Sequence, residues 1–182
     1  MKVLGVVGGP HREGNTVRLV EAVLEGAREA GHETVLVKLA DIEVRHIEEK
    51  GGKLYYPEDD MARKLGPHLE SMGALVLGTP IYYDHVDSRM KQFVDRLHYW
   101  SKTHGDEYRR RFPDGVKVVN CITCGWDDPE AYDEVLDWMT ERMEHYWRMR
   151  HVADLRAEGT GGKPVSSRKD LLERARRLGR SL

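Results

Sequence analysis

Short apolar runs alternate with longer amphipathic stretches from one end of the chain to the other. The apolar runs, which predict buried strands, cover residues 2–7, 33–38, 74–77, 116–122 and 151–155. Between them, apolar residues recur at steps of three and four, as in Val17, Val20 and Leu24, and this spacing predicts helices. The predicted helices cover 16–30, about 59–69 with an interruption at Gly66-Pro67, a segment from about 87, a segment from about 129 to 147, and a last one after 167.

Strands that are separated by helix-length segments favour a parallel sheet with helices on both faces. Five strands and five helical segments predict an α/β, three-layer, flavodoxin-like fold with strand order 2-1-3-4-5. In such sheets, ligands bind beyond the carboxyl ends of the strands. We therefore expect the turns after the first, third and fourth strands to meet at one site.

Length and charge narrow the functional class. A chain of 182 residues suits a single domain over 1–182, and a net charge of −2 gives no general attraction to nucleic acid. No apolar run is long enough to span a membrane, and the short apolar start does not suit a signal peptide. Two cysteines make no disulfide framework. We expect a cytoplasmic enzyme or binding protein.

The turn after the first strand predicts a phosphate site. Gly9-x-x-x-x-Gly14-Asn15-Thr16 has the spacing of a triphosphate-binding loop, but Asn15 replaces the lysine that balances the β- and γ-phosphates. A dinucleotide-binding G-x-G-x-x-G is absent. What remains suits a monophosphate held by backbone amides, with Asn15 or Thr16 also capping the helix. An ordinary Gly/Pro turn before a helix is the alternative.

Two further turns supply apolar and aromatic side chains. Pro80-Ile81-Tyr82-Tyr83 follows the third strand and could form a wall for a flat heteroaromatic ring, or the tyrosines could simply cover the sheet end. Cys121-Ile122-Thr123-Cys124-Gly125-Trp126 ends the fourth strand. Its C-x-x-C spacing admits a redox dithiol or a zinc site, but the absence of a helix start and of a second ligand pair favours buried thiols.

Together these turns and the segment Met90-Lys91-Gln92-Phe93-Val94-Asp95-Arg96 resemble the NADPH-dependent FMN reductase family, and more narrowly its iron–sulfur flavoprotein branch. The resemblance implies non-covalent FMN. It would place the 5′-phosphate on the backbone at Gly9 and on His11, Arg12, Asn15 and Thr16. The isoalloxazine would lie against Pro80, Ile81, Tyr82 and Tyr83, with Thr123, Cys124, Gly125 and Trp126 at its other edge.

The chain departs from that pattern in two places. Gly9 and His11 stand where the family usually has Ser and Arg, which removes a hydroxyl and makes one phosphate contact depend on pH. Residues 44–61, where the iron–sulfur branch has its cluster ligands, contain no cysteine, so we expect no iron–sulfur cluster there. Residues 41–57 read as a long polar loop, in which His46, Glu48 and Glu49 are more naturally solvated than metal-bound.

The resemblance implies an FMN-dependent NAD(P)H oxidoreductase. The nicotinamide would reduce the flavin, leave, and be replaced by a small acceptor such as a quinone or a flavin. No side chain is predicted as a catalytic acid or base, because the chemistry takes place at flavin N5. The family also implies a homodimer or homotetramer. The alternatives are an electron-transfer flavoprotein with a protein partner and no nicotinamide site, and a flavin-free interaction module on the same fold.

Overall fold

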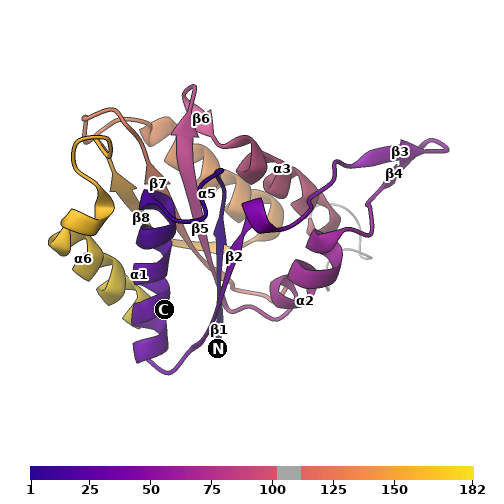
Figure 1. The fold of residues 1–182 in the computed structure, drawn as a ribbon. Helices are drawn as coiled ribbons and strands as arrows, with labels where there is room; N and C mark the ends of the chain where they lie inside the picture. Colours follow the sequence, from indigo (N-terminus) through magenta and orange to yellow (C-terminus); the bar gives the residue numbers. More distant parts are fainter. Residues whose placement is uncertain (102–111) are drawn as a thin grey trace.

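Five parallel strands form the centre of the molecule, which is described here from a computed structural model over residues 1–101 and 112–182. They are β1 (Lys2–Val7), β2 (Glu33–Lys38), β5 (Ala74–Tyr82), β7 (Lys117–Thr123) and β8 (Arg150–Ala157). The order across the sheet is β2-β1-β5-β7-β8, as Figure 1 shows. Counting only the parallel strands along the chain, this is 2-1-3-4-5, so the predicted topology is confirmed.

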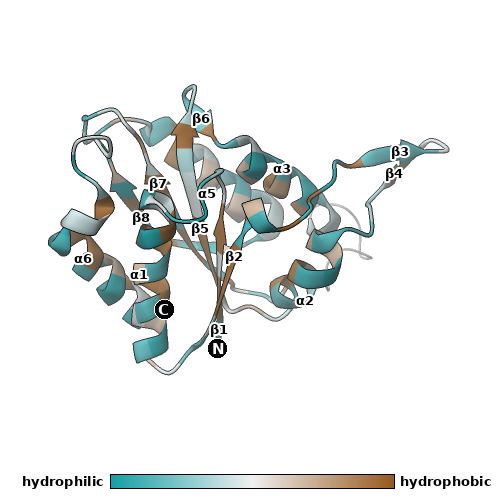
Figure 2. Ribbon diagram, viewed as in Figure 1, coloured by the Kyte–Doolittle hydropathy of each residue, from teal (hydrophilic) through white to brown (hydrophobic). Residues whose placement is uncertain are grey.

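Helices cover both faces of the sheet, which gives the three layers of a flavodoxin-like fold. One face packs against α1 (Asn15–Glu29) and α6 (Lys169–Arg180), and the other against α3 (Ser88–Arg96) and α5 (Asp133–Trp147). Alternate strand residues serve the two faces: in β1, Val3 and Val7 point to the first and Leu4 and Val6 to the second. The apolar colours in Figure 2 accordingly concentrate in the strands and on the inner sides of the helices.

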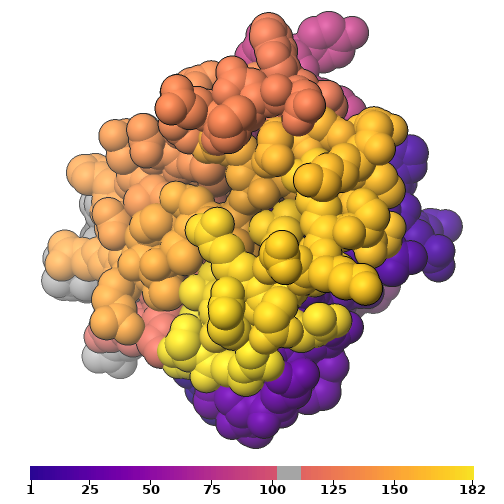
Figure 3. Space-filling view, turned by 90° about the vertical axis from the view of Figure 1, so that its left-hand side faces the viewer, coloured from indigo at the N-terminus to yellow at the C-terminus, as the bar shows by residue number. Residues whose placement is uncertain are grey.

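The first and last helices, α1 and α6, pack side by side with their backbones very close together. A Cβ added to Gly26 would lie 1.9 Å from the Arg176 carbonyl oxygen, and one on Gly179 would lie 1.9 Å from that of Val23. No side chain fits between the helices at these points. Figure 3, which faces this side, shows the yellow C-terminal segment packed beside the indigo-to-purple N-terminal segment.

The predicted loop at 41–57 is instead a β-hairpin that projects from the body of the molecule (Figure 1). Its strands are β3 (Glu48–Lys50) and β4 (Lys53–Tyr55). Gly51 and Gly52 form the two-residue turn at φ of 62° and 76°, which is the backbone that a tight hairpin requires. The strands are short and polar, so they give no alternation that would predict them.

A buried ion pair fixes the root of this hairpin. Asp59 and Arg96, from the segment before α2 (Gly66–Leu69) and from α3, are both fully buried and form an ion pair. The Asp59 carboxylate also accepts the Arg45 N–H at 2.7 Å and the Ala62 N–H at 3.0 Å. Arg96 donates further to the carbonyl oxygens of Arg45, at 2.7 Å, and Pro57, at 3.1 Å.

Because of these contacts, the free energy of unfolding depends on pH in the acid range. Burial acts to raise the pKa of Asp59, but the hydrogen bonds from Arg96, Arg45 and Ala62 outweigh it and lower that pKa below its ordinary value. A carboxyl whose pKa is lower in the folded state stabilises the fold above its unfolded pKa of about 3.9, and this contribution is lost as pH falls through the folded value. We expect the unfolding free energy of the wild type to fall below about pH 4, and Asp59→Asn to flatten that fall. Urea titrations between pH 2.5 and 6 measure both slopes, and equal slopes would contradict the assignment.

Two other predicted boundaries are wrong. Gly66-Pro67 does not end the helical segment, because a π-helical turn (Met61–Leu65) runs directly into α2, whose first turn contains Pro67. The third strand does not end at residue 77 but continues to Tyr82 and turns into β6 (His85–Val86). Tyr83 and Asp84, at φ of 47° and 62°, make that turn. No helix in the described residues is long and apolar enough to cross a membrane.

Candidate functional site

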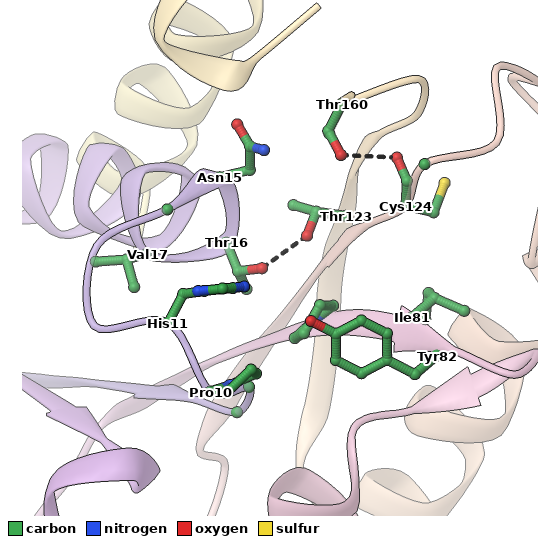
Figure 4. A pocket seen from close by; sticks show the side chains of 15 residues that line it. Pro10, His11, Asn15, Thr16, Val17, Ile81, Tyr82, Thr123, Cys124 and Thr160 are labelled. Atoms are coloured by element: carbon green, nitrogen blue, oxygen red, sulfur yellow. Dashed lines mark hydrogen bonds between the residues drawn. The ribbon is translucent and has the colours of Figure 1, made fainter. Parts of the chain in front are cut away.

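A cavity of about 210 Å³ opens at the carboxyl edge of the sheet, where the predicted turns after the first, third and fourth strands meet. Figure 4 shows Asn15 and Thr16 on one side of it, Thr160 and Cys124 on the other, and Tyr82 along a third side. The neighbouring strand ends are in register, since Pro80 pairs with Thr123 and Thr123 with Ala157. The lining residues are Gly8, Gly9, Pro10, His11, Gly14, Asn15, Thr16, Val17, Pro80, Ile81, Tyr82, Thr123, Cys124, Gly125 and Thr160.

The first wall is the N-terminus of α1. Gly14 is its N-cap and no side chain caps it, so the predicted capping by Asn15 or Thr16 is wrong. The Arg18 N–H is the first to bond back, to the Gly14 carbonyl at 3.0 Å, which leaves the N–H groups of Asn15, Thr16 and Val17 without acceptors in the helix. The first turn contains no acidic residue. Amides without acceptors in the helix and the positive end of the helix dipole together suit an anion.

Asn15 and Thr16 are instead held by residues distant in the sequence. The Asn15 side-chain oxygen accepts the Val165 N–H at 2.8 Å, and the Thr16 and Thr123 hydroxyls lie 2.6 Å apart. Because only the amide oxygen can accept that N–H, the Asn15 side-chain nitrogen is the atom left for a ligand. Figure 4 draws this nitrogen on the side facing Thr160. Asn15 therefore offers the cavity a hydrogen-bond donor in a fixed orientation.

Gly9 contributes shape rather than a phosphate donor. Its φ of 96° requires glycine, and a Cβ there would lie 2.8 Å from the Pro80 ring. Its N–H donates to the Asp87 carboxylate at 2.9 Å. The backbone contact predicted between Gly9 and phosphate is therefore not available in this arrangement.

The two candidate cations of the first turn separate. His11 lines the cavity, whereas Arg12 forms an ion pair with Asp41 and has 71% of its side chain exposed. Arg12 lies outside the cavity lining because the turn directs it toward the segment after β2. Among the residues that line the cavity, His11 is the one that can become a cation.

The second wall comes from the end of β5. Pro80, Ile81 and Tyr82 line the cavity, and Tyr82 is 44% exposed at its rim. Tyr83 does not line it. It is fully exposed at the tip of the β5–β6 turn, where its backbone is left-handed.

The third and fourth walls follow β7 and β8. Thr123, Cys124 and Gly125 line the cavity, whereas Trp126 lies outside the lining and is 66% exposed. Thr160, which sequence reasoning did not assign, follows β8. Its hydroxyl and its N–H both donate to the Cys124 carbonyl oxygen, at 2.9 and 3.0 Å. The carboxyl end of the fifth strand was the signal that could have indicated it.

Both cysteines are buried free thiols. Burial raises the pKa of Cys121, helped by the charge of Asp154, and burial also raises the pKa of Cys124. Protonated thiols are poor nucleophiles, so neither suits redox exchange. In the described residues, no group of three His, Cys, Asp or Glu side chains could hold a metal ion.

This burial predicts slow alkylation. At pH 8, iodoacetamide should react with the native protein about two orders of magnitude more slowly than with the urea-unfolded protein, because few thiols are ionised or reachable. In Cys121→Ser, where Cys124 is the remaining thiol, FMN should slow the reaction further, since Cys124 lines the cavity. Thiol counting by mass spectrometry measures the rates. Equal rates in folded and unfolded protein would contradict the placement.

Comparisons with known proteins identify the family of this chain. The sequence profile of the family described as NADPH-dependent FMN reductase matches residues 1–118. An iron–sulfur flavoprotein of Methanocaldococcus jannaschii is 33% identical over an alignment of 101 residues, which covers 53% of this chain and 51% of that protein. The chain thus matches about half the length of such relatives. YwqN of Bacillus subtilis, provisionally named an NAD(P)H-dependent FMN-containing oxidoreductase, is 28% identical over 98% of this chain and 96% of its own.

Solved structures agree on the fold. An NAD(P)H:quinone oxidoreductase from Methanothermobacter marburgensis superposes with a TM-score of 0.74 at 22% identity, covering 100% of this chain and 96% of that one. An archaeal flavodoxin gives a TM-score of 0.60 at 17% identity, covering 100% and 95%. The profile match over residues 1–118, more than half of the chain, shows that this chain belongs to the NADPH-dependent FMN reductase family.

Proposed function

We propose that this protein is an FMN-dependent NAD(P)H oxidoreductase that passes electrons to a small acceptor. The observation that carries the proposal is one cavity that joins an uncapped helix N-terminus to an apolar and aromatic wall. The first end suits a phosphate and the second suits a flat ring. FMN has both features, and relatives in the family are named for it.

The residues divide between the two ends of the ligand. The N–H groups that begin α1, the Asn15 amide nitrogen and the Thr16 hydroxyl would hold the 5′-phosphate, with His11 supplying charge when protonated. Pro80, Ile81 and Tyr82 would lie along the isoalloxazine, with Thr123, Cys124 and Gly125 at its other edge. Arg12, Tyr83 and Trp126 are left out of this set because they do not line the cavity.

When bound, FMN would supply the redox chemistry, as the hydride acceptor for the nicotinamide. The protein's own part is to bind and orient. The Thr16–Thr123 hydrogen bond joins the phosphate wall to the ring wall, and the apolar groups of Pro80 and Ile81 exclude water from one side. No lining side chain is assigned as an acid or base, and the acceptor proposed is a quinone or flavin that reaches the open rim beside Tyr82.

An absorbance spectrum and an FMN titration test the cofactor. We expect FMN to raise the melting temperature, riboflavin to bind more weakly, and NADH or NADPH to bleach the bound flavin in anaerobic stopped-flow mixing. Bound FMN that neither nicotinamide bleaches would favour the electron-transfer alternative. A colourless protein whose melting temperature FMN does not change would favour the flavin-free module.

Assembly and location are also proposals. We propose a single domain over 1–182, a homodimer or homotetramer, a cytoplasmic location and no iron–sulfur cluster. Light scattering after gel filtration measures the assembly, and an iron assay measures the metal.

A further inference from the structure

Asp87 is a buried carboxylate beneath the cavity that has no cationic partner among residues 1–101 and 112–182. It is 4% exposed and is the N-cap of α3. One of its oxygens accepts two backbone N–H groups, from Gly9 and from Arg89, each at 2.9 Å. Hydrogen bonds and the α3 dipole stabilise its negative charge, but no positive side chain neutralises it.

Asp87 connects the first turn of the cavity lining to the end of β5. Through Gly9 it holds the first turn, and its own N–H donates to the Thr79 hydroxyl at 3.0 Å, which in turn donates to the Pro80 carbonyl oxygen at 2.9 Å. Gly9 and Pro80 both line the cavity, and a Cβ on Gly9 would lie 2.8 Å from the Pro80 ring. One residue therefore separates the carboxylate from the space into which the ring would bind.

We propose that Asp87 is a tuning residue whose uncompensated charge lowers the reduction potential of the bound flavin. This inference rests on the proposed function, since it needs FMN in the cavity. Hydride transfer adds one proton and two electrons to the isoalloxazine, which gains a negative charge, while the nicotinamide becomes NAD(P)⁺. A fixed negative charge nearby disfavours the reduced, anionic ring relative to the oxidised, neutral one. A lower potential makes the reduced flavin a stronger donor to its acceptor.

Neutralising Asp87 should raise the potential. A unit charge within about 10 Å in a protein site changes an equilibrium by about tenfold or more. We expect Asp87→Asn to raise the affinity for reduced over oxidised FMN about tenfold, a shift of about +30 mV for a two-electron couple. Asp87→Ser, which can still cap α3 and also lacks the charge, should shift it in the same direction. Asp87→Glu keeps the charge, so its reduction potential should stay close to that of the wild type.

The experiment is a dithionite titration of FMN-loaded protein with an indicator dye of known potential. The matched control is Asp95→Asn, which removes one charge from the exposed outer side of the same helix. Melting temperatures of the apo forms report folding. If Asp87→Asn does not fold, Asp87→Ser carries the same charge change.

The outcomes separate this inference from the proposed function. Positive shifts in both neutral variants, with no shift in Asp95→Asn, support the tuning role. Neutral variants that fold, bind FMN and keep the wild-type potential overturn it, because a purely structural N-cap would behave in this way. A wild type that binds no FMN overturns the proposed function, and this inference with it.

Discussion

Replacing Arg96 by Met lowers the free energy of unfolding by about 3–5 kcal/mol, because the variant leaves the Asp59 carboxylate buried without its charged partner. The Arg45 and Ala62 N–H groups still reach the carboxylate, but they cannot balance its charge. Two carbonyl oxygens, on Arg45 and Pro57, lose their donor as well. Urea denaturation followed by circular dichroism at pH 7 measures the change.

A matched control lies on the same helix. Lys91→Met removes one partner of the exposed Lys91–Asp95 pair and should change stability by less than about 0.5 kcal/mol. Combining Arg96→Met with Asp59→Leu removes both buried charges and should recover part of the loss. A loss below about 1 kcal/mol in Arg96→Met alone would mean that water or a rearranged loop compensates the carboxylate.

Asn15→Asp should abolish tight FMN binding while leaving the fold intact. Aspartate has the shape of asparagine and can still accept the Val165 N–H. Its second oxygen, however, replaces the one donor nitrogen that Asn15 offers the cavity. A carboxylate there repels the phosphate, so we expect FMN affinity to fall by about 100-fold or more. Fluorescence quenching of free FMN measures the dissociation constant.

Three comparisons make this result specific. Riboflavin, which lacks the phosphate, should bind the variant and the wild type within about threefold. The apo melting temperature should hold or rise, because a negative charge in the first turn of α1 is favourable by about 0.3–1 kcal/mol. Ser71→Asp adds the same charge at the opposite edge of the sheet and should leave FMN affinity unchanged. Equal losses for FMN and riboflavin would place the phosphate elsewhere.

The sequence predicted the sheet well, because buried parallel strands are continuous apolar runs that stand out between amphipathic helices. It also brought the right turns together, since a parallel sheet places all its carboxyl ends at one edge. The prediction of a loop at residues 41–57 was wrong because each hairpin strand has three residues, too few for a recognisable pattern. The extension of β5 beyond residue 77 was not predicted because Pro80 and the two tyrosines resemble a turn. In the structure, Pro80 occupies a regular ladder position opposite Thr123.

Side-chain direction was the less predictable part of the site. The sequence placed Arg12, Tyr83 and Trp126 in the correct turns, but nothing local indicates that Arg12 would pair with Asp41 instead. The Asp59–Arg96 ion pair was not predicted because its residues are 37 positions apart. In the sequence both resemble polar surface residues, and only the tertiary fold buries them. Asp87 was visible only as a helix start, because its bond to Gly9 spans 78 positions.

The hairpin β3–β4 bears on how this chain can diversify in evolution. It adds no strand to the parallel sheet and no residue to the cavity lining, and the Asp59–Arg96 pair fixes its root in the core. Insertions or deletions at its tip are therefore insulated from the site. Natural selection could change the length or the surface residues of this hairpin without changing the cavity.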